Sequence, residues 1–272
     1  MRYVFAGDRQ ISCIILGFLI GKGFYPEALF VTDGVNATHS EELIRISGLE
    51  ESRIFKGKEV IKNGEVLGLL HKMELDYIIG IHYPYIISKE LLEIPKIGFL
   101  NLHPAYLPFN KGWNTPSWAI LDKSVYGATL HFMSEELDKG DIIHQKKIEV
   151  ATSDTANSLY QKVLKLEEEI FFEAFDGLVQ LNPKRIKQET EGSSYKKSDL
   201  QKIREFFLDE EIVIGDFLDK LRALTTNNPD EMAYFKEGER KIGVKIEFVE
   251  LSVDFYCNEL KMNNLQKKNR GG

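Results

Sequence analysis

The sequence predicts an α/β fold, in which an open, mostly parallel sheet with flanking helices precedes a small C-terminal α+β domain. Short, largely apolar strands alternate with helical segments in the first part of the chain, which is typical of a parallel sheet covered on both faces. A polar stretch at 182–198, which contains Pro, Gly and Ser, then precedes a region with helices and strands of its own. The 272 residues suffice for one large domain and a small second one.

The elements of the first domain can be taken in order. Apolar strands are expected at 2–6, 28–32, 76–81 and 98–102. A buried helix is expected at 11–21, where apolar residues recur at helical spacing, and a second helix at 40–47, where Ser40 can act as the cap and acidic residues fill the first turn.

The pattern changes near Gly127. Two partly alternating strands are expected at 128–133 and 142–150, joined by a polar loop that contains Asp138. A long helix should follow from about 155 to 181, capped by Ser153 or Asp154.

The expected domain organisation is a first domain at 1–181, a linker at 182–198 and a small C-terminal domain at 199–272. Within the last region, 199–224 is expected to be helical in two pieces, and 241–253 to form one or two strands.

Composition indicates a soluble cytoplasmic protein. Apolar residues make up 43% of the chain, and no segment approaches the roughly 18 uninterrupted apolar residues of a membrane helix. The first residues run directly into a strand, so no secretory signal is expected. Cys13 and Cys257 lie far apart and fit a reducing compartment. The net charge of −7 argues against a general nucleic-acid binder, and the basic run at 266–270 is expected to be a solvated end.

Polar side chains at the end of the 98–102 strand are the first candidates for catalysis. In an open α/β sheet, ligands bind beyond the carboxyl ends of the strands. Asn101 and His103 stand at this end, and strand alternation directs both side chains to the same side. Pro104 stops the strand from continuing.

Here the chain resembles the folate-dependent formyltransferase family. The family carries an N-x-H-P-S/A-x-L-P segment and, about 35 residues later, a strand that enters L-D-x-G. This chain has NLHPAYLP at 101–108 and GATLHFMSEELDKGDIIHQ at 127–145. The resemblance covers about residues 1 to 180. It implies a Rossmann-like sheet, with Asn101, His103 and Asp138 as the catalytic residues, and N10-formyltetrahydrofolate as co-substrate, without a metal.

The residue types suit that chemistry. When an amine attacks the formyl carbon, the carbonyl oxygen becomes an oxyanion, to which the Asn101 amide can donate a hydrogen bond. His103 can move protons between the attacking nitrogen and the folate N10 near neutral pH. Asp138 would orient His103 and stabilise its protonated form.

The acceptor amine could belong to a glycinamide, an initiator methionyl-tRNA, a UDP-linked aminoarabinose or a dTDP-linked amino sugar. HPAYLPFNKGWNTPSWAI at 103–120 resembles the bacterial nucleotide-sugar N-formyltransferases that act on dTDP-4-amino-4,6-dideoxyglucose. That resemblance implies a role in O-antigen or surface polysaccharide biosynthesis. Alternatives are a dTDP-3-amino sugar, methionyl-tRNA, and an inactive module that binds folate or a nucleotide sugar.

Further contacts are expected around the same edge of the sheet. The residues expected to contact the nucleotide sugar are Arg9, Tyr106, Asn110, Lys111 and Trp113. The residues that the resemblance places near the pterin are His82, Tyr83, Pro84 and Ala105. Trp118 is expected in the core of the helix that begins near Thr115. The stretch at 222–235 resembles a segment of longer family members, and a homodimer contact and a nucleotide lid are both compatible with it.

Overall fold

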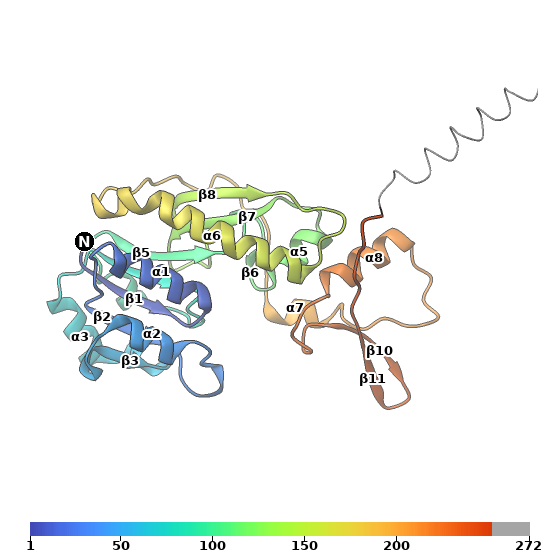
Figure 1. Ribbon diagram of the computed structural model, residues 1–272, viewed down its shortest axis with the longest axis horizontal. Helices are drawn as coiled ribbons and strands as arrows, with labels where there is room; N and C mark the ends of the chain where they lie inside the picture. The colour runs from blue at the N-terminus through green and yellow to red at the C-terminus, as the bar shows by residue number, and fades with distance from the viewer. Residues whose placement is uncertain (252–272) are drawn as a thin grey trace, which may run out of the picture.

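A seven-stranded sheet organises the first domain in the computed structural model, which describes residues 1–251 and, for Asn36, the backbone alone. The strand order is β3-β2-β1-β4-β5-β7-β8 (Figure 1). These strands are β1 (Tyr3–Gly7), β2 (Ala28–Val31), β3 (Ile54–Lys56), β4 (Tyr77–Ile81), β5 (Gly98–His103), β7 (Tyr126–Phe132) and β8 (Ile142–Ile148). The first five strands in this order are parallel, and β7 pairs antiparallel with both β5 and β8. The predicted open, mostly parallel sheet is therefore confirmed.

Helices connect the parallel strands and cover the sheet. They are α1 (Gln10–Gly21), α2 (Ser40–Ser47), α3 (Gly64–Lys72), α4 (Lys89–Leu92), α5 (Thr115–Leu121) and α6 (Ala156–Val179), with 3-10 turns at Gly34–Asn36, Glu51–Arg53 and Glu59–Lys62. Within the described part of the chain, no helix has both the length and the apolarity needed to cross a membrane.

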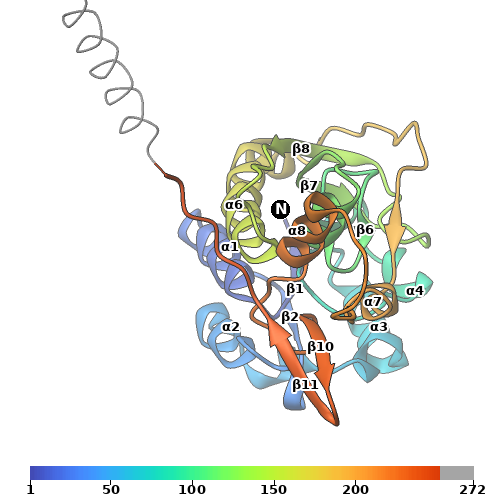
Figure 2. The same cartoon turned by 90° about the vertical axis from the view of Figure 1, so that its right-hand side faces the viewer.

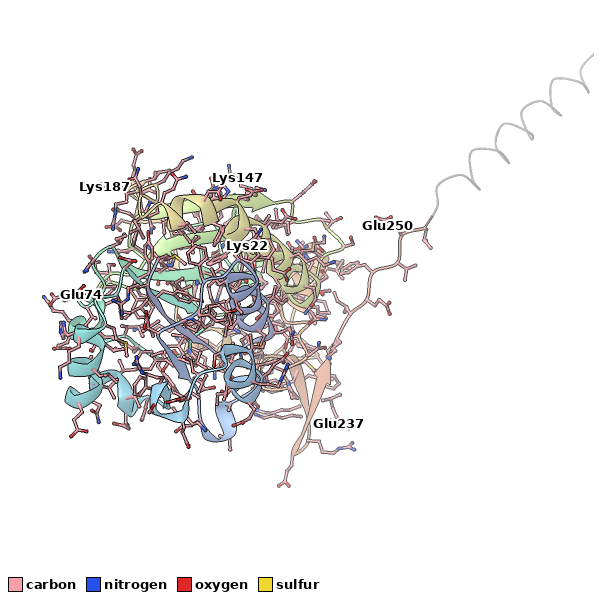
Figure 3. All side chains as sticks on the ribbon, turned by 60° about the vertical axis from the view of Figure 1, so that its left-hand side comes forward. Lys22, Glu74, Lys147, Lys187, Glu237 and Glu250 are labelled. Carbon is pink, nitrogen blue, oxygen red and sulfur yellow. The ribbon has the colours of Figure 1, made fainter. Side chains whose placement is uncertain are left out.

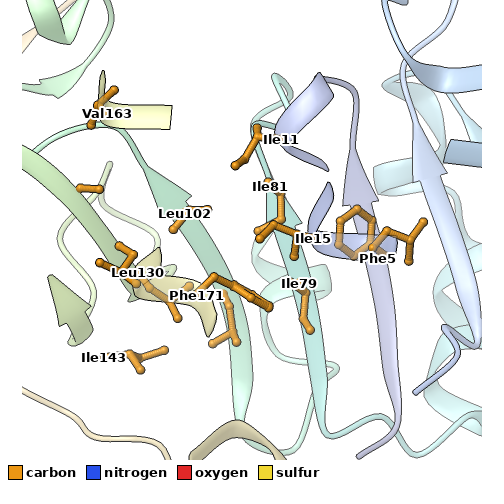
Figure 4. Packing of buried hydrophobic residues seen from close by; sticks show 14 of the residues in the cluster. Phe5, Ile11, Ile15, Ile79, Ile81, Leu102, Leu130, Ile143, Val163 and Phe171 are labelled. Atoms are coloured by element: carbon orange, nitrogen blue, oxygen red, sulfur yellow. The ribbon is translucent and has the colours of Figure 1, made fainter. Parts of the chain in front are cut away.

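Strands β1, β2, β4 and β7 are buried on both faces, whereas the edge strands β3 and β8 are partly exposed. In β1, Tyr3 and Phe5 join the core cluster on the side of α1 and α6, whereas Val4 joins the cluster on the opposite side. Figure 4 shows the larger cluster, in which side chains from the central strands pack with Ile15 of α1 and Phe171 of α6.

Two predicted helix caps were wrong. The side chain of Ser40 does not cap α2; its hydroxyl donates to the Asp8 carboxylate at 2.8 Å. Helix α6 is capped by Thr155, which accepts a hydrogen bond from Ser158 N–H, whereas Asp154 accepts from Ala151 N–H in the turn before it.

The C-terminal part contains α7 (Lys197–Gln201), α8 (Ile214–Ala223) and a hairpin of β10 (Ala233–Glu237) and β11 (Arg240–Val244). The hairpin begins earlier than the strand expected at 241–253, and residues 252 and 253 lie outside the described residues, as do Cys257 and the basic run at 266–270. Figures 2 and 3 show the hairpin extending from the molecule, with Glu237 at its tip.

The polar stretch at 182–198 lies against the first domain along much of its length. Its strand β9 (Ser194–Tyr195) pairs with β6 (Lys111–Gly112), and Ile186 forms a backbone bridge with Ile142. Tyr195 also stacks on Trp118, with ring centroids 3.9 Å apart. Trp118 is buried, as expected, in a small cluster shared with residues of the C-terminal part.

Candidate active site

The site is built around the carboxyl end of β5, which lies between β4 and β7. In the antiparallel register, Asn101 lies opposite His131 and His103 lies opposite Thr129. Strand β5 continues to His103, one residue beyond the predicted end, so the backbone of both candidate side chains is fixed by the sheet. Loop 133–141, which connects β7 to β8, brings Asp138 to the same place.

His103 and Asp138 face each other. Nε2 of His103 lies 3.6 Å from Oδ2 of Asp138, and both side chains are largely buried. The His103 nitrogen has no hydrogen-bond partner within residues 1–251. A buried ring nitrogen beside a carboxylate, with bonding capacity left over, is suited to exchanging a proton with a bound molecule.

Asp138 is held in its charged form. Burial raises the pKa of this carboxyl, but the neighbouring His103 and His131, together with the Gly112 N–H, lower the pKa by more, so that it lies below its usual value. The Gly112 N–H donates to Oδ2 at 3.0 Å. Asp138 also adopts the left-handed backbone region, with φ of 52°, which few non-glycine residues adopt and which Asp tolerates better than most.

His131 belongs to this group, although the sequence analysis did not single it out. It is fully buried, and its Nδ1 donates to the Phe132 carbonyl at 2.8 Å. Burial lowers the pKa of His131 to about 4, so the ring is neutral at physiological pH. Nε2 is then an acceptor, and Asn101 Nδ2 donates to it at 3.3 Å. The sequence feature that could have pointed to His131 is a polar ring within the otherwise largely apolar strand at 126–132.

The loop after His103 is firmly bonded to the domain. Thr129 Oγ1 donates to the Ala105 carbonyl and accepts from Leu107 N–H, and Ala105 itself is fully buried. Tyr106 is half-buried, with Lys147 Nζ 5.1 Å from its ring centroid.

The next three candidates differ in exposure. Asn110 is fully buried, and its amide donates to the Ser124 hydroxyl, so it stabilises the loop and does not face solvent. Lys111 is also buried, and its ammonium donates to the Glu191 carbonyl at 2.5 Å. Burial lowers the pKa of Lys111. Trp113 is about half exposed.

The turn after β1 carries Asp8 and Arg9. Asp8 is buried and accepts hydrogen bonds from the backbone of Thr38 and His39 and from the Ser40 hydroxyl. Arg9 is exposed, and its guanidinium donates to Thr38 Oγ1. Asp8 therefore ties the turn to the start of α2, and Arg9 is left at the surface.

The end of β4 places two candidates on opposite faces of the sheet. His82 has a φ of 50°, and its Nε2 lies 2.9 Å from Oε1 of the fully buried Glu167 of α6, a partner that the sequence did not suggest. The ring of Tyr83 packs on the other face, near Phe30 and Tyr85, and Pro84 lies between the two tyrosines in sequence. Because the Tyr83 ring is packed against the core, only the backbone of Tyr83 is left to contact a ligand at the carboxyl edge of the sheet.

Together, these residues form a compact group with complementary capacities. Asn101 supplies an amide donor, His103 a ring that can exchange a proton, and Asp138 a fixed negative charge. In the described part of the chain, no cluster of three or more His, Cys, Asp or Glu side chains has the arrangement of a metal site. The group can stabilise an oxyanion and move protons, which is what acyl transfer to an amine requires.

Comparison with known proteins identifies relatives of this chain. Residues 39–175 match the family model described as formyl transferase, and residues 199–250 match the N-formyltransferase dimerization C-terminal domain. The chain is 31% identical over 147 residues to dTDP-4-amino-4,6-dideoxyglucose formyltransferase of Mycobacterium tuberculosis, a match that covers 54% of this chain and 63% of that protein. It is also 31% identical over 201 residues to methionyl-tRNA formyltransferase of Clostridium tetani, which covers 72% of this chain and 64% of the relative.

A similar solved structure is that of a 4-N formyltransferase from Francisella tularensis. It superposes with a TM-score of 0.77 at 27% identity and covers 92% of this chain and 99% of that one. The matches to the two curated relatives each span less than two thirds of those proteins.

Proposed function

The chain belongs to the formyl transferase family, and on that premise we propose that it moves a formyl group from N10-formyltetrahydrofolate to the amino group of a dTDP-linked amino-dideoxy sugar. The preferred acceptor is dTDP-4-amino-4,6-dideoxyglucose, and the product would serve O-antigen or surface polysaccharide biosynthesis. The observation that carries the chemistry is the convergence of Asn101, His103 and Asp138 at the end of β5.

In this reaction, the sugar nitrogen attacks the formyl carbon and forms a new C–N bond, after which the bond between that carbon and folate N10 breaks. The Asn101 amide has two N–H groups: one donates to His131, and the other has no partner within residues 1–251 and would donate to the oxyanion. His103 takes the proton that the attacking nitrogen loses and gives a proton to N10 as it leaves. Asp138 stabilises the protonated ring between these steps.

We propose the binding contacts from the resemblance to the family and from the exposure of the side chains. We assign the pterin to the end of β4 and the start of the following loop, where His82, Tyr83 and Pro84 present backbone groups, with the buried Ala105 as part of the wall. Arg9 and Trp113 are exposed and fit a pyrophosphate and a flat ring or sugar face, respectively. Tyr106 lies on the same loop as Trp113.

Support for a sugar acceptor comes from two sides. A relative whose name gives a sugar acceptor, dTDP-4-amino-4,6-dideoxyglucose formyltransferase, is 31% identical over 147 residues, and a 4-N formyltransferase is similar over nearly the whole length of the chain. In addition, acidic residues outnumber basic ones between 199 and 251, which disfavours tracking of a tRNA phosphate backbone.

A panel of acceptors tests the proposal. The protein is incubated with N10-formyltetrahydrofolate and, separately, with dTDP-4-amino-4,6-dideoxyglucose, a dTDP-3-amino sugar, glycinamide ribonucleotide or methionyl-tRNA. Product mass reports formylation, and NMR of the sugar product locates the formylated nitrogen. Formylation of the 3-amino sugar alone would overturn the 4-amino preference, formylation of the tRNA or glycinamide alone would overturn the sugar acceptor, and absence of any product would overturn the activity.

We further propose that the C-terminal part forms a homodimer contact. Among residues 199–251, apolar side chains stand exposed in the loop before α8 and on the helix itself: Phe207, Leu208, Val213, Ile214 and Leu218 are between 40% and 74% exposed. This apolar surface lies in the region that matches a dimerization domain, so a second copy of the chain is its expected occupant.

The dimer is tested by light scattering after size-exclusion chromatography. The double variant Val213→Glu with Ile214→Glu should be monomeric at concentrations at which the wild-type protein is dimeric. Ile86→Glu is the control, because Ile86 is an apolar side chain that is even more exposed, at 92%, but lies in the first domain. A wild-type monomer, or a double variant that still dimerises, would contradict the proposal.

A further inference from the structure

Residues 186–195, here named the strap, run back along the first domain beside the candidate site. Ile186 and Ile142 exchange backbone hydrogen bonds at one end. At the other end, Lys111 N–H donates to Ser193 and Trp113 N–H donates to Tyr195. Gly192 adopts a φ of 64°, and a side chain there would overlap the Pro108 carbonyl. The strap is therefore fixed at both ends by main-chain bonds and passes closely over the loop after His103.

Gln188 lies between these fixed ends and binds the turn that carries Asp138. Its side-chain Nε2 donates to the Asp138 carbonyl at 2.8 Å and to the Gly140 carbonyl at 2.9 Å. Asp138 is in the left-handed region, and a Cβ at Gly140 would overlap the Phe132 carbonyl. One amide thus joins two carbonyls of a tight turn in which residue 138 has a positive φ and residue 140 has no room for a side chain.

The strap also holds in place the backbone N–H that binds the Asp138 carboxylate. The Gly112 N–H that donates to Oδ2 belongs to β6, and β6 is held in place by pairing with β9 of the strap. The backbone of Asp138 and a donor to its side chain are therefore both held by this one segment.

The oxygen of the Gln188 amide supports a specific role for the amide nitrogen. Oε1 of Gln188 is buried without a hydrogen-bond partner in the described structure. An unpaired buried oxygen costs free energy, which an apolar side chain of the same size would avoid. The two hydrogen bonds from Nε2 are the feature that such an apolar side chain could not supply.

We propose that Gln188 is a positioning residue for formyl transfer: by bridging the carbonyls of Asp138 and Gly140, it holds the carboxylate in line with His103 and the Gly112 N–H. This inference rests on the proposed function, because it takes Asp138 as a catalytic residue. Gln188 acts through the turn and not on the substrates, so it should affect kcat and leave KM for both substrates nearly unchanged.

The main test is Gln188→Met in the full-length protein, since Met has similar size and no amide donor. We expect kcat to fall by roughly 10- to 100-fold, the range for a catalytic group displaced by about 1 Å. Gln201→Met is the matched control: Gln201 also donates from Nε2 to a backbone carbonyl, at 2.8 Å, but it lies on the surface of the C-terminal part. This control should retain wild-type kcat.

Amide hydrogen exchange gives a second measure that needs no substrate. In Gln188→Met, the Gly112 N–H should exchange faster, because its acceptor carboxylate is no longer held. The amides of Lys111 and Trp113, which bond the strap backbone, should stay protected. If Gln188→Met does not fold, Gln188→Asn is used in its place, because it keeps the amide but is too short to reach both carbonyls.

The outcomes separate the two proposals. Wild-type protein that is inactive on every acceptor contradicts the proposed function. Active wild-type protein with unchanged kcat and unchanged Gly112 exchange in the Gln188 variant contradicts the positioning role. A variant with raised KM and intact kcat also contradicts it, because such a change indicates contact with a substrate.

Discussion

Replacing Asp138 by Asn tests how much of the proposed catalysis depends on a fixed negative charge. The substitution keeps the size of the side chain and one oxygen that can accept the Gly112 N–H, but it removes the charge that faces His103. Because the pKa of Asp138 lies below its usual value, the wild-type side chain is charged throughout the neutral range, and Asp138→Asn differs from it at every working pH.

The expected loss can be worked from the distance. Asp138 Oδ2 lies 3.6 Å from His103 Nε2. Unit charges about 4 Å apart attract each other by about 4 kcal/mol at an effective dielectric constant of about 20. If the full attraction is made only when His103 carries a proton during the reaction, its loss corresponds to roughly a 10³-fold fall in kcat. The same exchange in other catalytic triads costs about 10⁴.

The assay is the initial rate of product formation, by mass, at saturating N10-formyltetrahydrofolate and amino-sugar nucleotide between pH 6 and 9. Glu136→Gln is the control, since Glu136 is a carboxylate of the same loop that is exposed and pairs with Lys139. It should retain wild-type kcat. If Asp138→Asn retained kcat to within about tenfold of wild type across this range, electrostatic stabilisation of protonated His103 would be refuted.

Three further predictions concern buried groups. Because the pKa of His131 is lowered to about 4, protonation of the unfolded chain favours unfolding as pH falls from 6.5 towards 4. Urea titrations should show that this group contributes roughly 2 kcal/mol less to the free energy of unfolding at pH 5 than at pH 7. The variant His131→Gln should lack that part of the pH dependence. Asp8 has a lowered pKa, so its contribution to the free energy of unfolding is present at neutral pH and is lost as pH falls below about 3.8. In the same titrations, Asp8→Asn should lower the free energy of unfolding by roughly 2 kcal/mol at pH 7 and weaken this acid sensitivity. Burial raises the pKa of Cys13 to about 12, so in a Cys257→Ser background iodoacetamide should label the native protein far more slowly than the urea-unfolded protein; equal rates would contradict the burial.

Much of the fold was predictable because it rests on local patterns. Four short apolar segments became the parallel strands β1, β2, β4 and β5, since burial on both faces leaves a nearly continuous apolar sequence. Strand β3 was missed, because Ile54–Lys56 is only three residues long and lies at the edge of the sheet. The contacts of the polar stretch at 182–198 could not be foreseen, because they are made largely by backbone groups and polar side chains, with one aromatic stack by Tyr195, and such contacts leave no apolar pattern.

The candidate site was predictable in part for a related reason. Asn101 and His103 are two residues apart on one strand, and their shared direction follows from alternation. The burial of Asn110 and Lys111 could not be foreseen, since polar residues in a loop are usually exposed, and both are bonded by partners distant in sequence at Ser124 and Glu191. The pairing of His82 with Glu167 is similarly non-local, because it joins the end of β4 to the middle of α6.

The carboxylate of Asp138 shows why contacts between residues distant in sequence matter for function. The residues that fix its position come from β6 and the strap, at Gly112 and Gln188, and neither of them lies in the motif at 127–145. Because a displacement of about 1 Å can cost 100-fold in rate, an intact Asn-His-Asp pattern does not by itself secure activity. Changes in the strap should therefore lower kcat in a chain whose catalytic motifs are all present, and comparing Gln188→Met with Asp138→Asn measures how much of the carboxylate's effect depends on its being held in place.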